Sequence, residues 1–178
     1  MASRVQTAHS CRMDRTTRTT RPRASPIPAR QSPDEALRDA AAILARAEAD
    51  EAAANAAREL YRAQPMAALE PDTQIGPMLE VDEKVLAVRR HVMLERQADT
   101  IHAEGPTDMG GRLYLTSRRL VLIGRQTLSF ELDKIAEIML SGERLLLVMR
   151  DGHGAALDAA QPRLMRVEIS AARLSARG

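Results

Sequence analysis

The sequence is poor in cysteine and in aromatic residues, and both shortages exclude classes of protein. Its one cysteine, Cys11, lies in a polar basic stretch, so neither an intramolecular disulfide nor a zinc site built from thiolates can form. Tryptophan is absent, and the aromatic residues are Tyr61, Tyr114 and Phe130. This leaves little ring surface on which nucleobases could stack. We therefore expect an aliphatic core and no binding of single-stranded nucleic acid.

Long hydrophobic runs are also missing. No apolar stretch in the sequence approaches the ~18 to 20 residues of a membrane-spanning helix, and the N-terminus lacks the apolar middle of a secretory signal. Together with the single cysteine, this favours the reducing cytoplasm and predicts no transmembrane segment. Peripheral contact with the inner face of the membrane is the alternative location.

Motifs for catalysis and for metal binding are absent from the sequence. The four histidines are dispersed, and no His-Glu-x-x-His, Cys-x-x-Cys, phosphate-binding glycine loop or Gly-x-Ser-x-Gly occurs. They are His9, His91, His102 and His153. We therefore expect a protein that is not an enzyme, with no catalytic residues, no cofactor and no metal.

The net charge of +2 averages two unlike parts. Residues 1–32 carry seven arginines against one acid, Asp14, which gives this segment +6 and leaves −4 for the rest. The segment has no hydrophobic period, so it is predicted to be a disordered basic tail. Its arginines could contact phosphates of anionic lipid or nucleic acid. The alternatives are an unstructured leader, an organelle transit peptide or a later translation start at Met13. The Ala- and Arg-rich composition favours a bacterial source.

A long Ala-rich helix is predicted for residues 33–64. Ser32-Pro33-Asp34-Glu35 is a capping box with proline at the first helical position, and Pro65 ends the helix. Leu37 and Leu44 are followed at the same spacing by Glu51 and Arg58, so a heptad is not sustained. Self-association through residues 33–64 stays open beside a solvated or loosely docked helix. Residues 65–80, with three prolines, are predicted to be a linker.

The second half of the chain has the pattern of consecutive antiparallel strands. Apolar residues alternate in short runs, and turn residues separate the runs at roughly ten-residue intervals. The runs are Leu113/Leu115, Leu120/Leu122, Leu128/Phe130/Leu132 and Leu145/Leu147. An earlier strand is predicted near 84–96, with a bulge or bend at Arg89-Arg90-His91, followed by an acidic loop. A last helix over 162–176 carries an apolar stripe of Leu164, Val167, Ala171 and Leu174, expected to pack on the sheet.

At the residue level, the run from Gly111 to Val121 (GRLYLTSRRLV) resembles the strand-turn-strand motif of GRAM and bacterial PH-like domains. Leu132-Asp133-Lys134-Ile135 is similar to the entry into their next strand. The resemblance covers about residues 75–176. It implies an α+β fold in which a PH-like antiparallel β-barrel or sandwich, over residues 81–178, is closed by a C-terminal helix. The acidic loop after the first strand argues against the phosphoinositide pocket of eukaryotic PH domains.

Six basic residues are the candidate site: Lys84, Arg89, Arg90, Arg112, Arg118 and Arg119. If the first three strands are neighbours, several of these side chains could form a patch that attracts anionic lipid or an acidic protein. Our first hypothesis is a protein-interaction or scaffolding module, with strand edges and the groove beside the last helix as contact sites. Association with anionic membrane lipids through the patch and the basic tail is the alternative. Nucleic acid ranks below both.

Overall fold

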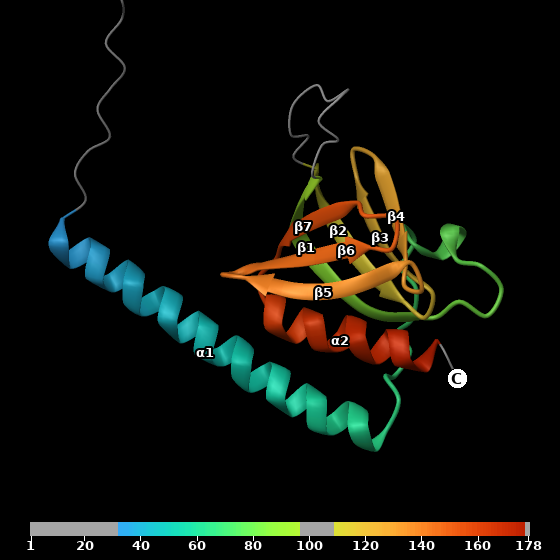
Figure 1. Cartoon of the computed structure of the whole chain (residues 1–178), viewed down its shortest axis with the longest axis horizontal. Coiled ribbons are helices and arrows are strands. Elements are labelled where there is room, and N and C mark those ends of the chain that lie inside the picture. Colours follow the sequence, from blue (N-terminus) through green and yellow to red (C-terminus); the bar gives the residue numbers. More distant parts are fainter. Residues whose placement is uncertain (1–31, 97–108, 177–178) are drawn as a thin grey trace, which may run out of the picture.

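The computed structural model describes residues 32–96 and 109–176 (Figure 1). Within them, helix α1 spans Pro33–Ala63, a 3₁₀ turn spans Gly76–Met78, and helix α2 spans Pro162–Ser175. The strands are β1 (Val85–Arg96), β2 (Met109–Thr116), β3 (Arg119–Gly124), β4 (Thr127–Glu131), β5 (Ile135–Ser141), β6 (Arg144–Met149) and β7 (Gly154–Asp158). The predictions for the basic tail up to residue 31 and for the acidic loop lie outside the described residues.

The seven strands form one antiparallel sheet in the order β4-β3-β2-β1-β7-β6-β5. β1 joins the two halves of the sheet, because it pairs with β2 on one side and its last four residues pair with β7 on the other. The sheet curls, and α2 lies against it (Figure 1). The predicted fold class is confirmed: an α+β chain with an antiparallel sheet, a closing C-terminal helix and a long helix before the sheet.

The predicted interruption of the first strand is present. The register between β1 and β2 shifts between Arg89 and Val92, and His91 adopts a left-handed backbone with φ of 55°. A bulge bends a strand and increases its twist. The bend allows one strand to pair with both halves of a strongly curled sheet.

Alternating aliphatic residues of the strands build the core, as the sequence pattern indicated. Leu113, Leu115, Leu120, Leu122, Leu145 and Leu147 are all buried. Met165, Ile169 and Ala172 of α2 belong to the same buried cluster. Each fully buried aliphatic side chain contributes about 1.5 to 3 kcal/mol relative to an exposed one, so these residues account for the attachment of α2 to the sheet.

The prediction of which side of the last helix faces the sheet was wrong. The residues of α2 that are buried are Pro162, Met165, Glu168, Ile169 and Ala172. The predicted stripe, Leu164, Val167, Ala171 and Leu174, lies on another side of the helix, where Leu174 is 72% exposed. The error has a physical cause: α2 is apolar on two sides, and periodicity alone cannot tell which of them meets the sheet.

Helix α1 begins where the capping box predicted. The Ser32 hydroxyl accepts from the Glu35 amide at 3.2 Å, and the Glu35 carboxylate accepts from the Ser32 amide at 3.1 Å. The C-terminal half of α1 packs on α2 through the buried residues Asp50, Ala54 and Ala57. The N-terminal half extends beyond the rest of the domain (Figure 1). One helix therefore has a docked half and a projecting half.

Asp50 connects the two helices by capping α2 from outside. Gln161, at the N-cap position of α2, makes no side-chain cap hydrogen bond. The Asp50 carboxylate instead accepts from the Arg163 amide at 2.8 Å and from the Leu164 amide at 3.0 Å. These amides are among the first-turn donors that have no partner within a helix, and a carboxylate is favourable at the positive end of the helix dipole.

The segment between α1 and β1 packs along the sheet. Ile75 is fully buried in a second apolar cluster with Val85, Tyr114 and Val121, and Leu69 forms an isolated bridge with Val85. This packing carries the acidic residues of the segment to the arginines of β2 and β3.

Candidate functional site

The six predicted basic residues lie in three places rather than in one patch. Lys84, Arg118 and Arg119 lie near the turn between β2 and β3, where the Lys84 amide donates to the Ser117 hydroxyl and the Lys84 carbonyl accepts from the Ser117 amide. Arg90 and Arg112 line a shallow hollow elsewhere on the domain. Arg89 contacts α2. The strands are neighbours as expected, but their arginines point to different partners.

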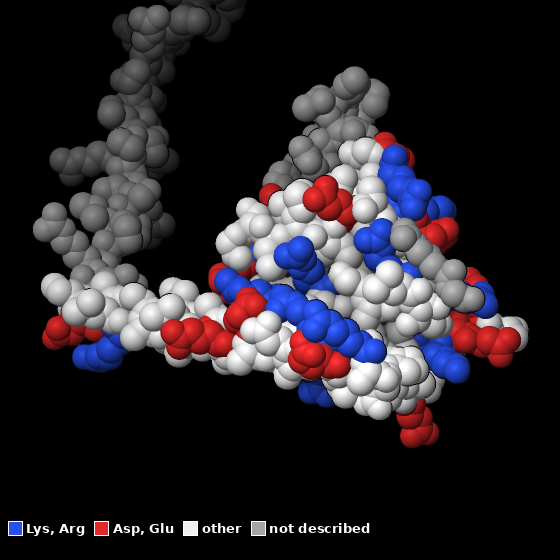
Figure 2. Space-filling model, turned by 60° about the horizontal axis from the view of Figure 1, so that its bottom comes forward, with Lys and Arg blue, Asp and Glu red and all other residues white. Residues whose placement is uncertain are grey.

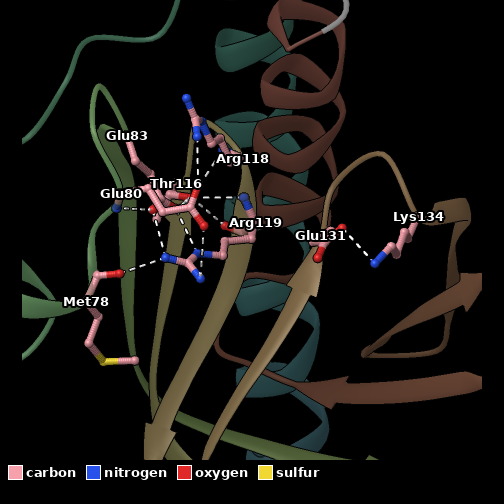
Figure 3. Close-up of polar contacts among 8 residues, drawn as sticks. All are labelled: Met78, Glu80, Glu83, Thr116, Arg118, Arg119, Glu131 and Lys134. Carbon is pink, nitrogen blue, oxygen red and sulfur yellow. Dashed lines mark hydrogen bonds and ion pairs between the residues drawn. The ribbon is translucent and has the colours of Figure 1, made fainter.

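Arg119 is held by a buried carboxylate, that of Glu83 (Figure 3). Its Nε and Nη2 atoms donate to the two Glu83 oxygens at 2.9 and 2.8 Å, and the Thr116 hydroxyl donates to the same carboxylate at 2.6 Å. Burial alone would raise the pKa of Glu83. Hydrogen bonds from Arg119, from the Glu80 amide and from Thr116 outweigh burial and bring this pKa below its ordinary value.

Two further arginines are paired with acids of the same segment. Arg118 contacts Glu80 at 2.7 Å (Figure 3), and Arg112 contacts Asp72 at 2.7 Å. The Tyr114 hydroxyl also donates to Asp72, at 2.8 Å, and this bond is the largest cause of the lowered pKa of Asp72. The segment before β1 thus places an acid beside each of three predicted site arginines.

Arg89 is paired inside the domain. Its Nη2 atom lies 2.7 and 2.6 Å from the two oxygens of Glu168 on α2, and Glu168 is only 7% exposed. Burial raises the pKa of the Glu168 carboxyl, and the charge and hydrogen bond of Arg89 offset part of that effect. Of the six residues, only Lys84 and Arg90 are exposed without a carboxylate partner among the described residues.

A second candidate is the groove between α1 and α2, with a volume of about 380 Å³. We call it the α1/α2 groove. Its apolar surface comes from Tyr61, Pro65, Met66, Val167, Ala171 and Leu174. The stripe that sequence analysis assigned to the sheet therefore contributes three of these side chains. The groove beside the last helix was named as a contact site from the sequence, but its α1 wall was not.

The α1/α2 groove is basic as well as apolar. Arg58, Arg62 and Arg166 line it, and no carboxylate does. Arg58 and Arg62 form exposed ion pairs along their own helix, with Glu51 and Glu59. Such surface pairs contribute about 0 to 1 kcal/mol and exchange easily. Figure 2 views the underside of the molecule, where basic side chains form a band across the face on which the helices lie.

The α1 wall of the groove could have been found from one signal in the sequence. Asp50, Ala54, Ala57 and Tyr61 follow each other at spacings of four, three and four residues, which places them on one helix face. Alanine at such positions permits close approach of another helix, but its small side chain gives little hydropathy signal. Asp50 itself has the appearance of an ordinary solvated acid.

Features for other chemistries are absent from the described part of the chain. Among residues 32–96 and 109–176, no three His, Cys, Asp or Glu side chains gather closely enough to hold a metal ion. No helix in these ranges combines the length and hydropathy that crossing a bilayer requires. Of the four histidines, His91 lies in the β1 bulge and His153 in the turn before β7, while His9 and His102 lie outside the described residues.

Comparison with known proteins finds similarity only at the level of fold. No family model matches the sequence, and no curated protein matches it. Among solved structures, the Vps36 N-terminal PH domain is similar with a TM-score of 0.45 and 21% identity, over 62% of this chain and 92% of that chain. The C-terminal domain of an unknown protein from Leishmania infantum has a TM-score of 0.39 and 14% identity, over 52% and 86%.

Proposed function

We propose that this protein is a non-enzymatic, cytoplasmic binding module of the GRAM-like bacterial type, and that it binds an acidic, amphipathic helical segment of a protein in the α1/α2 groove. In this proposal the chain divides into a basic tail (1–32), a helix (33–64), a linker (65–80) and the PH-like domain (81–178). One observation carries it: an apolar groove between two helices, lined by three arginines and by no acid. A helix with apolar residues at i, i+3, i+4 and i+7 is the natural occupant of such a groove.

The free energy of the buried ion pairs argues against a membrane lipid as the partner of these arginines. A basic residue near an anionic membrane surface gains about 1 kcal/mol. Breaking a buried ion pair by removing one partner costs about 3 to 5 kcal/mol, and the Glu83 side chain beside Arg119 is fully buried. Membrane attraction is therefore too small to withdraw Arg119 or Arg89 from its carboxylate. Lys84 and Arg118, whose pair with Glu80 is exposed, lie apart from Arg90, so these few charges would give a weak membrane site.

The test is selection of peptides from a displayed random library against the full chain. We expect the enriched peptides to be acidic, with apolar residues at helical spacing. A Leu174→Glu variant should bind them at least tenfold more weakly, since the new carboxylate repels acids and removes apolar contact. Val81→Glu is the matched control, because Val81 is 83% exposed and lies outside the groove. Both variants should keep the circular dichroism spectrum of the unmodified chain.

Two results would count against the proposal. Equal binding of the enriched peptides to Leu174→Glu and Val81→Glu would show that the groove is not the site. Retention on vesicles rich in phosphatidylserine that is lost in a Lys84→Ala/Arg90→Ala variant, with no peptide enriched, would favour the lipid alternative instead.

A further inference from the structure

The projecting half of α1, residues 33–49, is exposed along its length except at Ala47, which is half-buried. We call this segment the arm. Its large apolar side chains are solvent-exposed: Leu37 by 69%, Ile43 by 52% and Leu44 by 60%. Isolated exposed leucines are common on protein surfaces, but here three large apolar residues lie within about two turns of a projecting helix and, with the alanines between them, form a continuous apolar face.

The apolar face of the arm continues the face with which α1 packs on α2. Ala36, Ala40, Ile43 and Ala47 precede Asp50, Ala54 and Ala57 at alternating spacings of four and three residues, so all seven share one stripe. In its second part the stripe is buried against a helix. In its first part the same stripe, flanked by Leu37 and Leu44, has no helix beside it among the described residues (Figure 1).

The charges of the arm complement those of the α1/α2 groove. The arm carries four carboxylates, Asp34, Glu35, Asp39 and Glu48, against two arginines. The groove carries three arginines and no carboxylate. The basic tail is not complementary to the groove, because its seven arginines would be repelled by the three arginines that line the groove. The arm is thus an acidic amphipathic helix of the kind that the groove is proposed to bind.

We propose that the arm of one chain lies in the α1/α2 groove of a second copy, and that the second arm returns the contact, to give an antiparallel two-fold dimer. This inference rests on the proposed function, since it names the helix that occupies the groove. The arm and the groove lie at opposite ends of one helix, which is about 46 Å long at 1.5 Å per residue. Antiparallel alignment of two such helices places each arm beside the other groove.

The alignment also fixes an approximate register. With the two-fold axis near Glu48, the middle of α1, Leu37 of one copy comes level with the stretch Arg58–Arg62 of the other. There it meets the groove, whose wall that stretch forms. Ile43 lies on the part of the stripe that turns toward α2 of the second copy. Because the contact is isologous, each favourable interaction occurs twice.

The test uses sedimentation equilibrium on the full chain in the micromolar range. We expect a reversible dimer. Leu37→Glu/Leu44→Glu should raise the dimer dissociation constant at least about a hundredfold, because in each dimer the two Leu37 side chains no longer fill the grooves and the substitutions at Leu44, level with residue 52, put carboxylates between the facing helices. Leu174→Glu in the groove should have a similar effect, whereas Val81→Glu should leave the dissociation constant unchanged. The substituted leucines are exposed, so circular dichroism should report an intact fold.

A mixing experiment separates this geometry from any other dimer. The arm variant Leu37→Glu/Leu44→Glu retains its groove, and Leu174→Glu retains its arm, so a mixture can form one arm–groove contact. Fluorescently labelled samples of the two should associate at least tenfold more tightly with each other than with themselves.

Three outcomes would overturn the inference. These are a monomeric chain throughout the micromolar range, a dimer that the arm variant leaves intact, and a mixture that associates no better than its components. If the chain is monomeric while library peptides still bind the groove and are lost in Leu174→Glu, the dimer is refuted and the proposed function stands. If Leu174→Glu weakens neither the binding of peptides nor the binding of a second copy, the dimer and the proposed function are both refuted.

Discussion

Removal of the Asp50 carboxylate should loosen α1 from α2 and destabilise the domain. In an Asp50→Ala variant, the amides of Arg163 and Leu164 lose their acceptors, which lie at 2.8 and 3.0 Å, and Gln161 provides no substitute cap. Loss of a cap costs about 0.5 to 2 kcal/mol. Loss of a partly buried charge at a helix N-terminus costs up to about 2 kcal/mol. We expect the free energy of unfolding to fall by about 2 to 3 kcal/mol.

Urea denaturation followed by circular dichroism measures this loss, and two further variants identify its cause. Glu48→Ala removes an exposed acid of the same helix and should change the free energy of unfolding by less than about 0.5 kcal/mol. Asp50→Asn should be intermediate, because it keeps one of the two oxygens that accept from these amides but replaces the other with an NH₂ group and loses the charge. If Asp50→Ala is as stable as Glu48→Ala, the capping argument is refuted. Hydrogen exchange of the Arg163 and Leu164 amides should be faster in Asp50→Ala.

Three other predictions concern the ionic contacts and the sheet. Arg119→Ala should lower the free energy of unfolding by about 3 kcal/mol in urea denaturation because it leaves the Glu83 charge buried and unpaired, and an Arg119→Ala/Glu83→Leu variant that is no more stable would contradict this. The pKa values of Asp72 and Glu83 are lowered from 3.8 and 4.5, so the stability that these groups provide is complete above those ordinary values and is lost as the pH falls through the lowered ones. In a Glu83→Gln variant, the thermal midpoint should therefore fall less steeply below about pH 4.5 than in the unmodified chain. Parallel plots of thermal midpoint against pH would refute this. Gly111→Val should lower the thermal midpoint, since a Cβ atom there would overlap the backbone carbonyl oxygen of Ile123 in β3, whereas Gly76→Ala, with its nearest atom at 3.9 Å, should not.

The sheet could be predicted from the sequence because its signals are local. Alternation such as Leu120 and Leu122 fixes which face of a strand is buried, and turn residues fix where the strand ends. The bulge in β1 was visible for the same reason, since the alternation fails at Arg89-Arg90-His91. The start of α1 follows from four adjacent residues, those of the capping box at Ser32. Each of these features needs no knowledge of what lies across the fold.

The partners of the arginines could not be predicted, because they depend on contacts between distant segments. Arg119 and Glu83 are 36 positions apart, and Arg89 and Glu168 are 79 apart. A sequence shows each charge but not the burial that joins it to another. The sequence alone therefore supported a basic patch, whereas in the structure four of its six members already have carboxylate partners. The α1/α2 groove was hidden for a related reason, since Ala54 and Ala57 have little hydropathy signal.

One alanine stripe runs along both halves of α1, and in each half a different kind of residue adds to the weak contact that alanine makes. Alanine permits helices to approach closely but buries little apolar area, so a stripe of alanines alone holds a neighbouring helix weakly. In the docked half, Asp50 strengthens the contact because its carboxylate caps α2. In the arm, Leu37, Ile43 and Leu44 could each contribute about 1.5 to 3 kcal/mol when buried. The groove exists only while the docked half stays in place. Asp50 is therefore a positioning residue for the proposed site, although it touches no part of an incoming helix.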